Sequence, residues 1–210
     1  MKTLTTIIIA TALAAMLTSC GNDTHSQSAA LKKKAKQGDA TAQFNLGEYY
    51  DKRYDEKGSD KDRSEAVNWY RKAAEQGHAG AQFNIGVCYD TGDCVEMDKA
   101  EAMKWWLKAA AQGYDKAKAA IDLKIKATKE GMSTIKTAAQ TFMIRNGNYP
   151  DSIDGLTQPN GGFPPVLNVE STIDPFGNPF SYKKMATSLE IRSAGPDGTM
   201  ETLDDLVINF

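Results

Sequence analysis

Apolar residues recur at helical spacing through the middle of the chain. Phe44, Gly47 and Tyr50 stand three positions apart, which places them on one face of an α-helix. Near the carboxyl end, short apolar runs lie between turn signals rich in Gly, Pro and Asn, a pattern typical of strands. The predicted strands are residues 180–184, 188–192 and 206–210. The pattern therefore predicts a long helical part followed by a smaller part that contains a sheet.

The helical pattern is repeated. Residues 42–50 match residues 81–89 with an offset of 39, and residues 66–77 match residues 102–113 with an offset of 36. A period in this range is typical of solenoids built from helix hairpins. Gly47 and Gly86 hold the same position in the two repeats. Because Gly inside a helix is unfavourable by about 1 kcal/mol, we expect a neighbouring helix to pack closely there.

The repeats resemble the Sel-one-like repeat family, which is related to the tetratricopeptide repeats. In the second repeat the residues that fit the family pattern are Asp98, Ala102, Trp105, Trp106, Lys108, Ala109 and Gly113. The resemblance implies an α-solenoid over residues 31–123 that binds protein partners. The pairs Trp69/Tyr70 and Trp105/Trp106 are either binding residues or core between stacked helices, and their helical spacing favours core.

A further helix is predicted over residues 133–145, with Ile135 and Phe142 on its buried face and Asn146-Gly147-Asn148 at its end. The sequence leaves open whether the helical residues 117–130 continue into it through Gly131. Together with the three short strands, this helix predicts an α+β unit in which it packs on a small antiparallel sheet.

The motifs of this unit resemble the periplasmic domain of the major pseudopilin of type II secretion. They are Asn-Gly-x-Tyr-Pro at 146–150, Gly155-Leu156, the run Asp174–Tyr182 and Ser-Ala-Gly-Pro-Asp-Gly at 193–198, in the family's order. The resemblance implies a pseudopilin-like domain over residues 124–210. The expected fold class is thus α plus α+β, a short α-solenoid of helix-hairpin repeats followed by a pseudopilin-like helix on a small antiparallel sheet.

Three carboxylates, those of Asp197, Asp204 and Asp205, fall in the stretch before the last strand. Carboxylates held close together repel one another unless a cation neutralises them, and calcium prefers such oxygen ligands. The pseudopilin resemblance implies a structural calcium ion held by the Ala194 carbonyl and these three side chains. The alternative is a solvated acidic loop.

The amino-terminal residues predict export and lipid attachment. Lys2 and the apolar run 4–17 form a short signal sequence that ends in Leu17-Thr18-Ser19-Cys20, which resembles the bacterial lipoprotein box. The expected arrangement is a signal peptide over 1–19, lipid on Cys20, and a polar tether over 20–30. This predicts a lipid-anchored protein of the bacterial cell envelope, in the outer membrane facing the periplasm.

Two further cysteines, Cys88 and Cys94, are expected to form a disulfide in an oxidising compartment, and the alternative is two thiols with Cys88 in the core. The chain has 25 Lys and Arg against 27 Asp and Glu, and its basic residues form no stripe with interleaved aromatics. Nucleic acid is therefore not an expected partner.

The sequence favours a non-catalytic envelope protein that mediates protein–protein interaction, linked to type II secretion through its last domain. Pseudopilins begin with a hydrophobic helix, and in this chain the repeats stand in its place, so we do not expect polymerisation as a pilin subunit. The alternatives are a minor component of a pilus-like secretion fibre and an enzyme acting on peptidoglycan or β-lactams. An enzyme is disfavoured because His78 is the sole histidine after the tether and known nucleophile motifs are absent.

Overall fold

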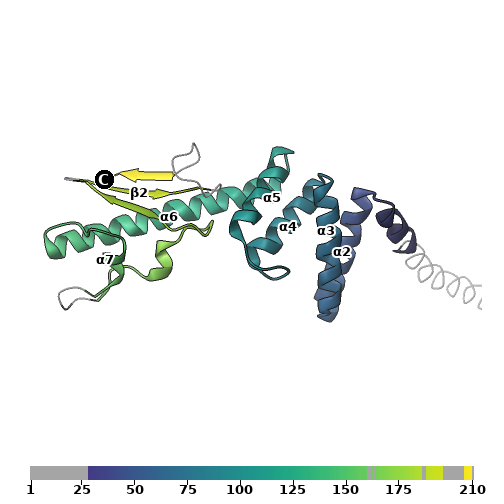
Figure 1. Cartoon of the computed structure of the whole chain (residues 1–210), viewed down its shortest axis with the longest axis horizontal. Helices are drawn as coiled ribbons and strands as arrows, with labels where there is room; N and C mark the ends of the chain where they lie inside the picture. The colour runs from purple at the N-terminus through teal and green to yellow at the C-terminus, as the bar shows by residue number, and fades with distance from the viewer. Residues whose placement is uncertain (1–27, 160–161, 163, 186–187, 196–205, 210) are drawn as a thin grey trace, which may run out of the picture. The chain divides into compact units, whose positions relative to one another are not determined.

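A computed structural model describes residues 28–159, 162, 164–185, 188–195 and 206–209 (Figure 1). The polypeptide forms two compact units, one that ends at Ala81 and one that begins at Gln82. Both units contain α-helices, and the second also contains the sheet. The predicted fold class is confirmed.

The first unit is built around a helix hairpin. Residues 28–36 are helical, and they are followed by α2 (Ala40–Lys57) and α3 (Asp60–Glu75), which pack against each other. Asp39 is the N-cap of α2, and its carboxylate accepts a hydrogen bond from the Ala42 amide at 2.7 Å. Gly58 is the C-cap, in the left-handed conformation with φ 63°. One buried core cluster of this unit contains Ala35, Ala42, Leu46 and Trp69.

The second unit continues the repeat pattern with α4 (Ala79–Thr91), α5 (Lys99–Ala111) and the first turns of α6 (Asp115–Asn146). Asp98 caps α5 in the way that Asp39 caps α2, with its carboxylate 2.8 Å from the Glu101 amide. A pair of glutamines also recurs: Gln76 donates to Gln43 at 2.6 Å, and Gln112 donates to Gln82 at 2.8 Å. These equivalent bonds show that the sequence repeat is also a structural one.

The helix glycines lie where aromatic rings pack against the helix backbone. A Cβ atom at Gly47 would lie 2.5 Å from the ring of Tyr70, and one at Gly86 would fall on the indole of Trp106. Trp106 also donates its indole N–H to the Phe83 carbonyl at 3.2 Å, which holds the ring across α4. The expected close packing is confirmed, because only the absence of a side chain makes room for these rings.

The C-terminal part of the second unit is a sheet that lies along α6 (Figure 1). Its strands β1 (Ser181–Lys184), β2 (Leu189–Ser193) and β3 (Leu206–Asn209) are antiparallel in the order β1-β2-β3. The short helices α7 (Asp154–Thr157) and η1 (Val169–Thr172) lie between α6 and β1. The buried core is Met132, Ile135, Ala138, Ala139, Leu156, Leu167, Phe180, Leu189 and Ile191.

The three predicted strands are confirmed to within one residue at each end that the structure describes. Helix α6 is a single helix of 32 residues, so the helical residues on either side of Gly131 are continuous. Its course runs through the expected domain boundary between residues 123 and 124. A Cβ at Gly131 would lie 3.2 Å from the ring of Phe180, so this glycine lets the sheet approach the helix.

Substitution of Gly86 by Ala should destabilise the chain, because the new methyl group would meet the Trp106 indole and lie 3.1 Å from the Ala102 carbonyl oxygen. We expect a loss of about 1–2 kcal/mol in the free energy of unfolding, since an overpacking penalty exceeds the gain in helix propensity. Urea denaturation followed by tryptophan fluorescence measures it.

The matched control is Gly131→Ala, the same change inside a helix, where the nearest atom is the rim of Phe180 at 3.2 Å. We expect a change of less than about 1 kcal/mol there, because the rim of a side chain yields more easily than a packed indole and a backbone carbonyl. Equal effects of the two substitutions would contradict the account of the repeat glycines.

Candidate functional site

A buried polar network of the second unit is formed around the carboxylate of Asp174, which is 2% exposed. One carboxylate oxygen accepts the amides of Phe176 at 3.0 Å and Asn178 at 2.8 Å. The other accepts the hydroxyl of Ser193 at 2.6 Å. Three hydrogen bonds satisfy a buried carboxylate that would otherwise be strongly unfavourable, so the turn Asp174–Asn178 is fixed to the end of β2.

A second set of bonds extends this connection into the start of the predicted metal loop. The Gly195 amide donates to the Ser193 hydroxyl oxygen at 3.1 Å, and the Asn178 side-chain amide donates to the Gly195 carbonyl at 3.2 Å. Gly195 is in the left-handed conformation with φ 65°, which a residue with a side chain rarely adopts. The backbone at the base of the loop is therefore held by hydrogen bonds from two sides.

Of the four expected calcium ligands, Ala194 lies in this base and is 3% exposed. Asp197, Asp204 and Asp205 lie outside the described residues. The strand register pairs Ser193 with Leu206, the residues on either side of segment 194–205, so the two ends of the segment are fixed side by side. A fixed base and an all-oxygen donor set fit a hard cation such as calcium. Over the residues that the structure describes, no group of three or more acidic, His or Cys side chains is arranged to hold a metal.

Sequence reasoning missed the role of Asp174 and Ser193. Both belong to motifs that carry the pseudopilin resemblance, but neither motif by itself indicates a contact between the two residues. The two residues are 19 positions apart. Only the pairing of an acidic turn with a serine at the end of a strand could have indicated that they meet.

The aromatic pairs of the repeats lie mainly in the core. Trp69, Tyr70 and Trp106 are 9%, 3% and 4% exposed, which confirms the interpretation as core. Trp105 is half-buried, and the ammonium group of Lys108 lies 4.1 Å from the centre of its ring. These side chains therefore serve packing more than binding.

A different aromatic cluster reaches the surface of the first unit. The rings of Tyr49 and Tyr50 meet edge to face at 5.5 Å, and the side chains of Lys32 and Arg53 each lie 5.7–5.9 Å from both rings. Tyr49 is 38% exposed. We call these four residues the tyrosine cluster. Sequence analysis did not identify it, although Tyr49-Tyr50 followed by a basic residue one helical turn later is a usable signal.

His78 is not the solvated loop residue that its position in a turn suggests. Its ring is half-buried and stacks on Phe44 with centroids 4.4 Å apart, and its Nδ1 accepts a hydrogen bond from the Ala81 amide at 3.2 Å.

Cys88 is buried on α4 and Cys94 is half-buried in the following loop. The disulfide between Cys88 and Cys94 stays a prediction.

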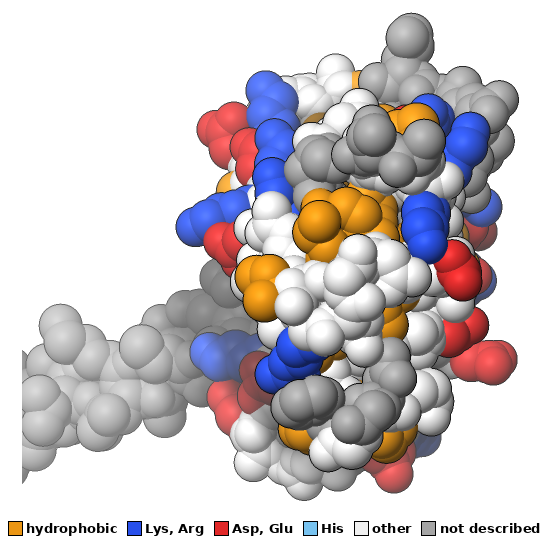
Figure 2. Space-filling model, turned by 90° about the vertical axis from the view of Figure 1, so that its left-hand side faces the viewer, with side chains coloured by type: hydrophobic (Ala, Val, Ile, Leu, Met, Phe, Trp, Pro, Cys, Tyr) orange, Lys and Arg blue, Asp and Glu red, His pale blue; other side chains and the backbone are white. Residues whose placement is uncertain are grey.

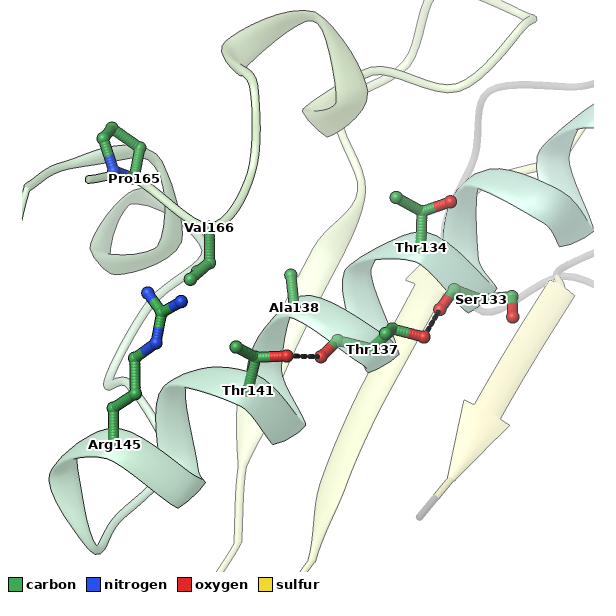
Figure 3. A pocket seen from close by; sticks show the side chains of 8 residues that line it. All are labelled: Ser133, Thr134, Thr137, Ala138, Thr141, Arg145, Pro165 and Val166. Atoms are coloured by element: carbon green, nitrogen blue, oxygen red, sulfur yellow. Dashed lines mark hydrogen bonds between the residues drawn. The ribbon is translucent and has the colours of Figure 1, made fainter. Parts of the chain in front are cut away.

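A groove runs along α6 beside residues 164–166 (Figure 3). It is lined by Ser133, Thr134, Thr137, Ala138, Thr141, Arg145, Pro165 and Val166. The hydroxyls of Thr134, Thr137 and Thr141 donate to backbone carbonyls of their own helix at 2.9–3.0 Å. Because these donors are already used, the threonines offer a ligand only acceptor positions, and the donors of the groove are those of Ser133 and Arg145.

The face at the end of the C-terminal domain carries apolar side chains between charged ones (Figure 2). Ile144, near the end of α6, is 84% exposed. Single exposed apolar residues are common on protein surfaces, and nothing in this face indicates what would cover them.

Within the described part of the chain, three side chains have clearly shifted pKa values, and each shift has a structural cause. Burial raises the pKa of Asp51, and the nearby Asp55 raises it further. Burial also raises the pKa of Tyr182, whose hydroxyl donates to the Pro150 carbonyl at 3.0 Å. The Arg192 guanidinium donates to Glu190 at 2.7 Å and lowers the pKa of that carboxyl. None of these groups lines the groove, so the shifts do not indicate an acid–base site.

Among the residues that the structure describes, no helix is both long and apolar enough to cross a membrane.

Comparison with protein families identifies both parts of the chain. Residues 40–78 and 79–114 each match the Sel1 repeat, and residues 116–209 match the type II secretion system protein G. Together the matches cover α2 to α5 and then α6 to β3.

The solved structures that align with about half of the chain include the following two. One is c5321, a protective antigen of uropathogenic Escherichia coli with an SLR fold, at 35% identity and a TM-score of 0.41, over 49% of this chain and 21% of the antigen. The other is a Sel1 repeat protein from Oxalobacter formigenes, at 33% identity and a TM-score of 0.40, over 48% of this chain and 71% of that protein. No curated protein matches the chain. The chain belongs to the Sel1 repeat family over residues 40–114 and carries a type II secretion system protein G domain over residues 116–209.

Proposed function

We propose that this chain is a non-catalytic, lipid-anchored protein of the cell envelope that binds a protein partner through its repeats, with a calcium-stabilised C-terminal domain linked to type II secretion. The observation that carries the proposal is the direct fusion of an interaction module to a secretion-related domain. The Sel1 repeat match ends at Tyr114, and the protein G match begins at Lys116, so a single residue separates them. Sel1 repeats and pseudopilin-like domains are generally non-catalytic, which agrees with a binding role.

An envelope location is supported by the protein G domain and by the apolar run before Cys20. Lipid on Cys20 would hold the chain at a membrane surface while residues 20–30 separate the folded part from it. Outer-membrane attachment is part of the proposal and rests on the sequence, where Gly21 rather than an acidic residue follows the cysteine.

Substitution of Cys20 by Ser should release the chain from the membrane fraction. We expect the unaltered protein to sediment with membranes and to require detergent for release, whereas Cys20→Ser stays in the soluble fraction. Quantitative immunoblotting after fractionation measures the split, and Cys94→Ser is the matched control that should remain with the membranes. A soluble unaltered protein would rule out the lipid anchor.

Calcium would be held by the Ala194 carbonyl and the carboxylates of Asp197, Asp204 and Asp205. Its chemistry there is the neutralisation of three negative charges in one short segment. The fixed base formed by Ser193 and Leu206 supports the site, because ligands on a segment with joined ends lose less conformational entropy on binding the ion.

Calcium should therefore raise the melting temperature. At a free concentration about 100-fold above the dissociation constant, mass action adds about 2.7 kcal/mol of stability, which corresponds to a rise of roughly 5 °C or more. Differential scanning fluorimetry of the full chain, first in EGTA and then with calcium, measures the shift.

The variant Asp197→Ala should lose most of this response, while Asp93→Ala, which removes an exposed aspartate elsewhere in the second unit, should keep it. If the unaltered protein shows neither a thermal shift nor calcium binding by calorimetry, the calcium site is wrong.

The tyrosine cluster is the surface that best fits a protein partner. Tyr and Arg are the residue types most often found at energetic centres of interfaces, and here their side chains are already ordered by mutual contact. Side chains that are ordered before binding lose less conformational entropy when the partner associates. Arg53 is also held by an ion pair with the buried Asp62 at 3.2 Å.

The variant Tyr49→Ala should weaken partner capture by about tenfold or more, since Tyr side chains at such positions contribute about 1–2 kcal/mol or more. Immobilised full chain is incubated with envelope extract, and bound proteins are quantified by mass spectrometry. Leu107→Ala is the control, because Leu107 is similarly exposed at 43% but belongs to the second unit. Equal capture by all three proteins would exclude the cluster as the binding surface.

A second candidate function is favoured by the protein G match itself, namely a minor component of a pilus-like secretion fibre. It predicts that the chain co-purifies with assembled fibres, whereas a partner-binding lipoprotein is distributed through the membrane fraction without them. Immunogold labelling of sheared fibres distinguishes the two.

A further inference from the structure

A side chain of the C-terminal domain, Phe176, is buried together with residues of the second repeat. Phe176, in the turn after Asp174, is 2% exposed and lies in a buried cluster with Met103 and Trp106 of α5 and Ala117 of α6. At the neighbouring Gly177, an added Cβ would lie 3.6 Å from the side chain of Lys99, so the turn also touches the first residue of α5. The side chains of this contact therefore come from α5 of the second repeat, from α6 and from the turn that follows Asp174.

A solenoid needs such a contact at its end. Each repeat buries its apolar face against the next one, so the last repeat exposes that face unless a cap covers it. The first turns of α6 cover part of α5 through Ala117 and neighbouring residues, and Phe176 belongs to the same buried cluster as Trp106 and Met103. The compact units agree with this arrangement, because α5 falls in the same unit as the sheet.

The turn is rigid enough to act as a cap. The buried Asp174 carboxylate accepts the amides of Phe176 and Asn178, and the Gly177 amide donates to the Asp174 carbonyl at 2.9 Å. The Ser193 hydroxyl then fixes this turn to β2 at 2.6 Å. A displacement of Phe176 from the repeat would therefore disturb the strand, and loss of the strand would release Phe176.

We propose that the turn Asp174–Asn178 is the C-terminal cap of the solenoid and joins the second repeat and the protein G domain into one cooperative folding unit. The surface around Met103 and Trp106 is then the binding site of the chain's own turn. It is closed to an external partner, which must use other surfaces of the repeats.

Native-state hydrogen exchange of the full chain tests the proposal, with mass spectrometry resolving peptides from α5 and from β2. In Phe176→Ala the slowest amides of α5 should exchange roughly 100-fold faster or more, because a buried aromatic side chain is lost from their core. The control is Ile173→Ala, in the same segment but 52% exposed, which should change α5 less than about threefold. Unchanged protection of α5 in Phe176→Ala would overturn the cap.

A second substitution tests cooperativity from the other side. Leu156 is fully buried in a core cluster that, among the described residues, is formed by α6, α7, the sheet and the segments between them and not by α5. Leu156→Ala should raise exchange in α5 by the same factor as in β2 if the two open together. Faster exchange in β2 alone would show independent opening and would overturn the proposal.

If Phe176→Ala does not fold, Phe176→Leu decides by the same criterion, with an expected rise of about tenfold in α5.

Discussion

Helix α6 must serve two different packing partners with one continuous backbone. Its first turns pack Ala117 and Ile121 against α5, and its later turns bury Met132 and Ile135 under the sheet. A helix repeats every 3.6 residues, so the apolar face of the first half fixes the direction of the second. The repeat and the sheet cannot be rotated independently about the helix axis without breaking it.

Small residues make this double packing possible. Ala117, Gly131 and Ala139 lie at points where bulkier neighbours approach α6, and Gly131 meets the ring of Phe180. A glycine in a helix is unfavourable in itself, and here the close contact with the sheet offsets that loss. The first half of the helix also carries Lys116, Lys118 and Lys124. The ammonium group of Lys124 forms an ion pair with the carboxylate of Asp90 on α4 at 2.6 Å, so this half of α6 contacts the repeat through charged as well as apolar side chains.

Much of the fold could be predicted because its information is local. The repeat period placed the helices, and turn motifs bounded the three strands. The burial of Phe176 in the repeat core could not be predicted, since an aromatic residue in a turn has no periodic neighbours that point to its partner. The Asp174–Ser193 bond was missed for the same reason. Asp197, Asp204 and Asp205 are proposed as calcium ligands from a family resemblance, and they lie outside the described residues.

The Asp174 carboxylate connects these observations physically. Without its three hydrogen bonds a buried charge would be too unfavourable to keep, so Phe176, Asn178 and Ser193 hold their positions together or lose them together. The same network reaches Gly195, where the proposed calcium segment begins. An ion that orders that segment would favour the arrangement that also places Phe176 in the repeat. The proposed metal site and the proposed solenoid cap, both within the region that matches protein G, would then stabilise each other.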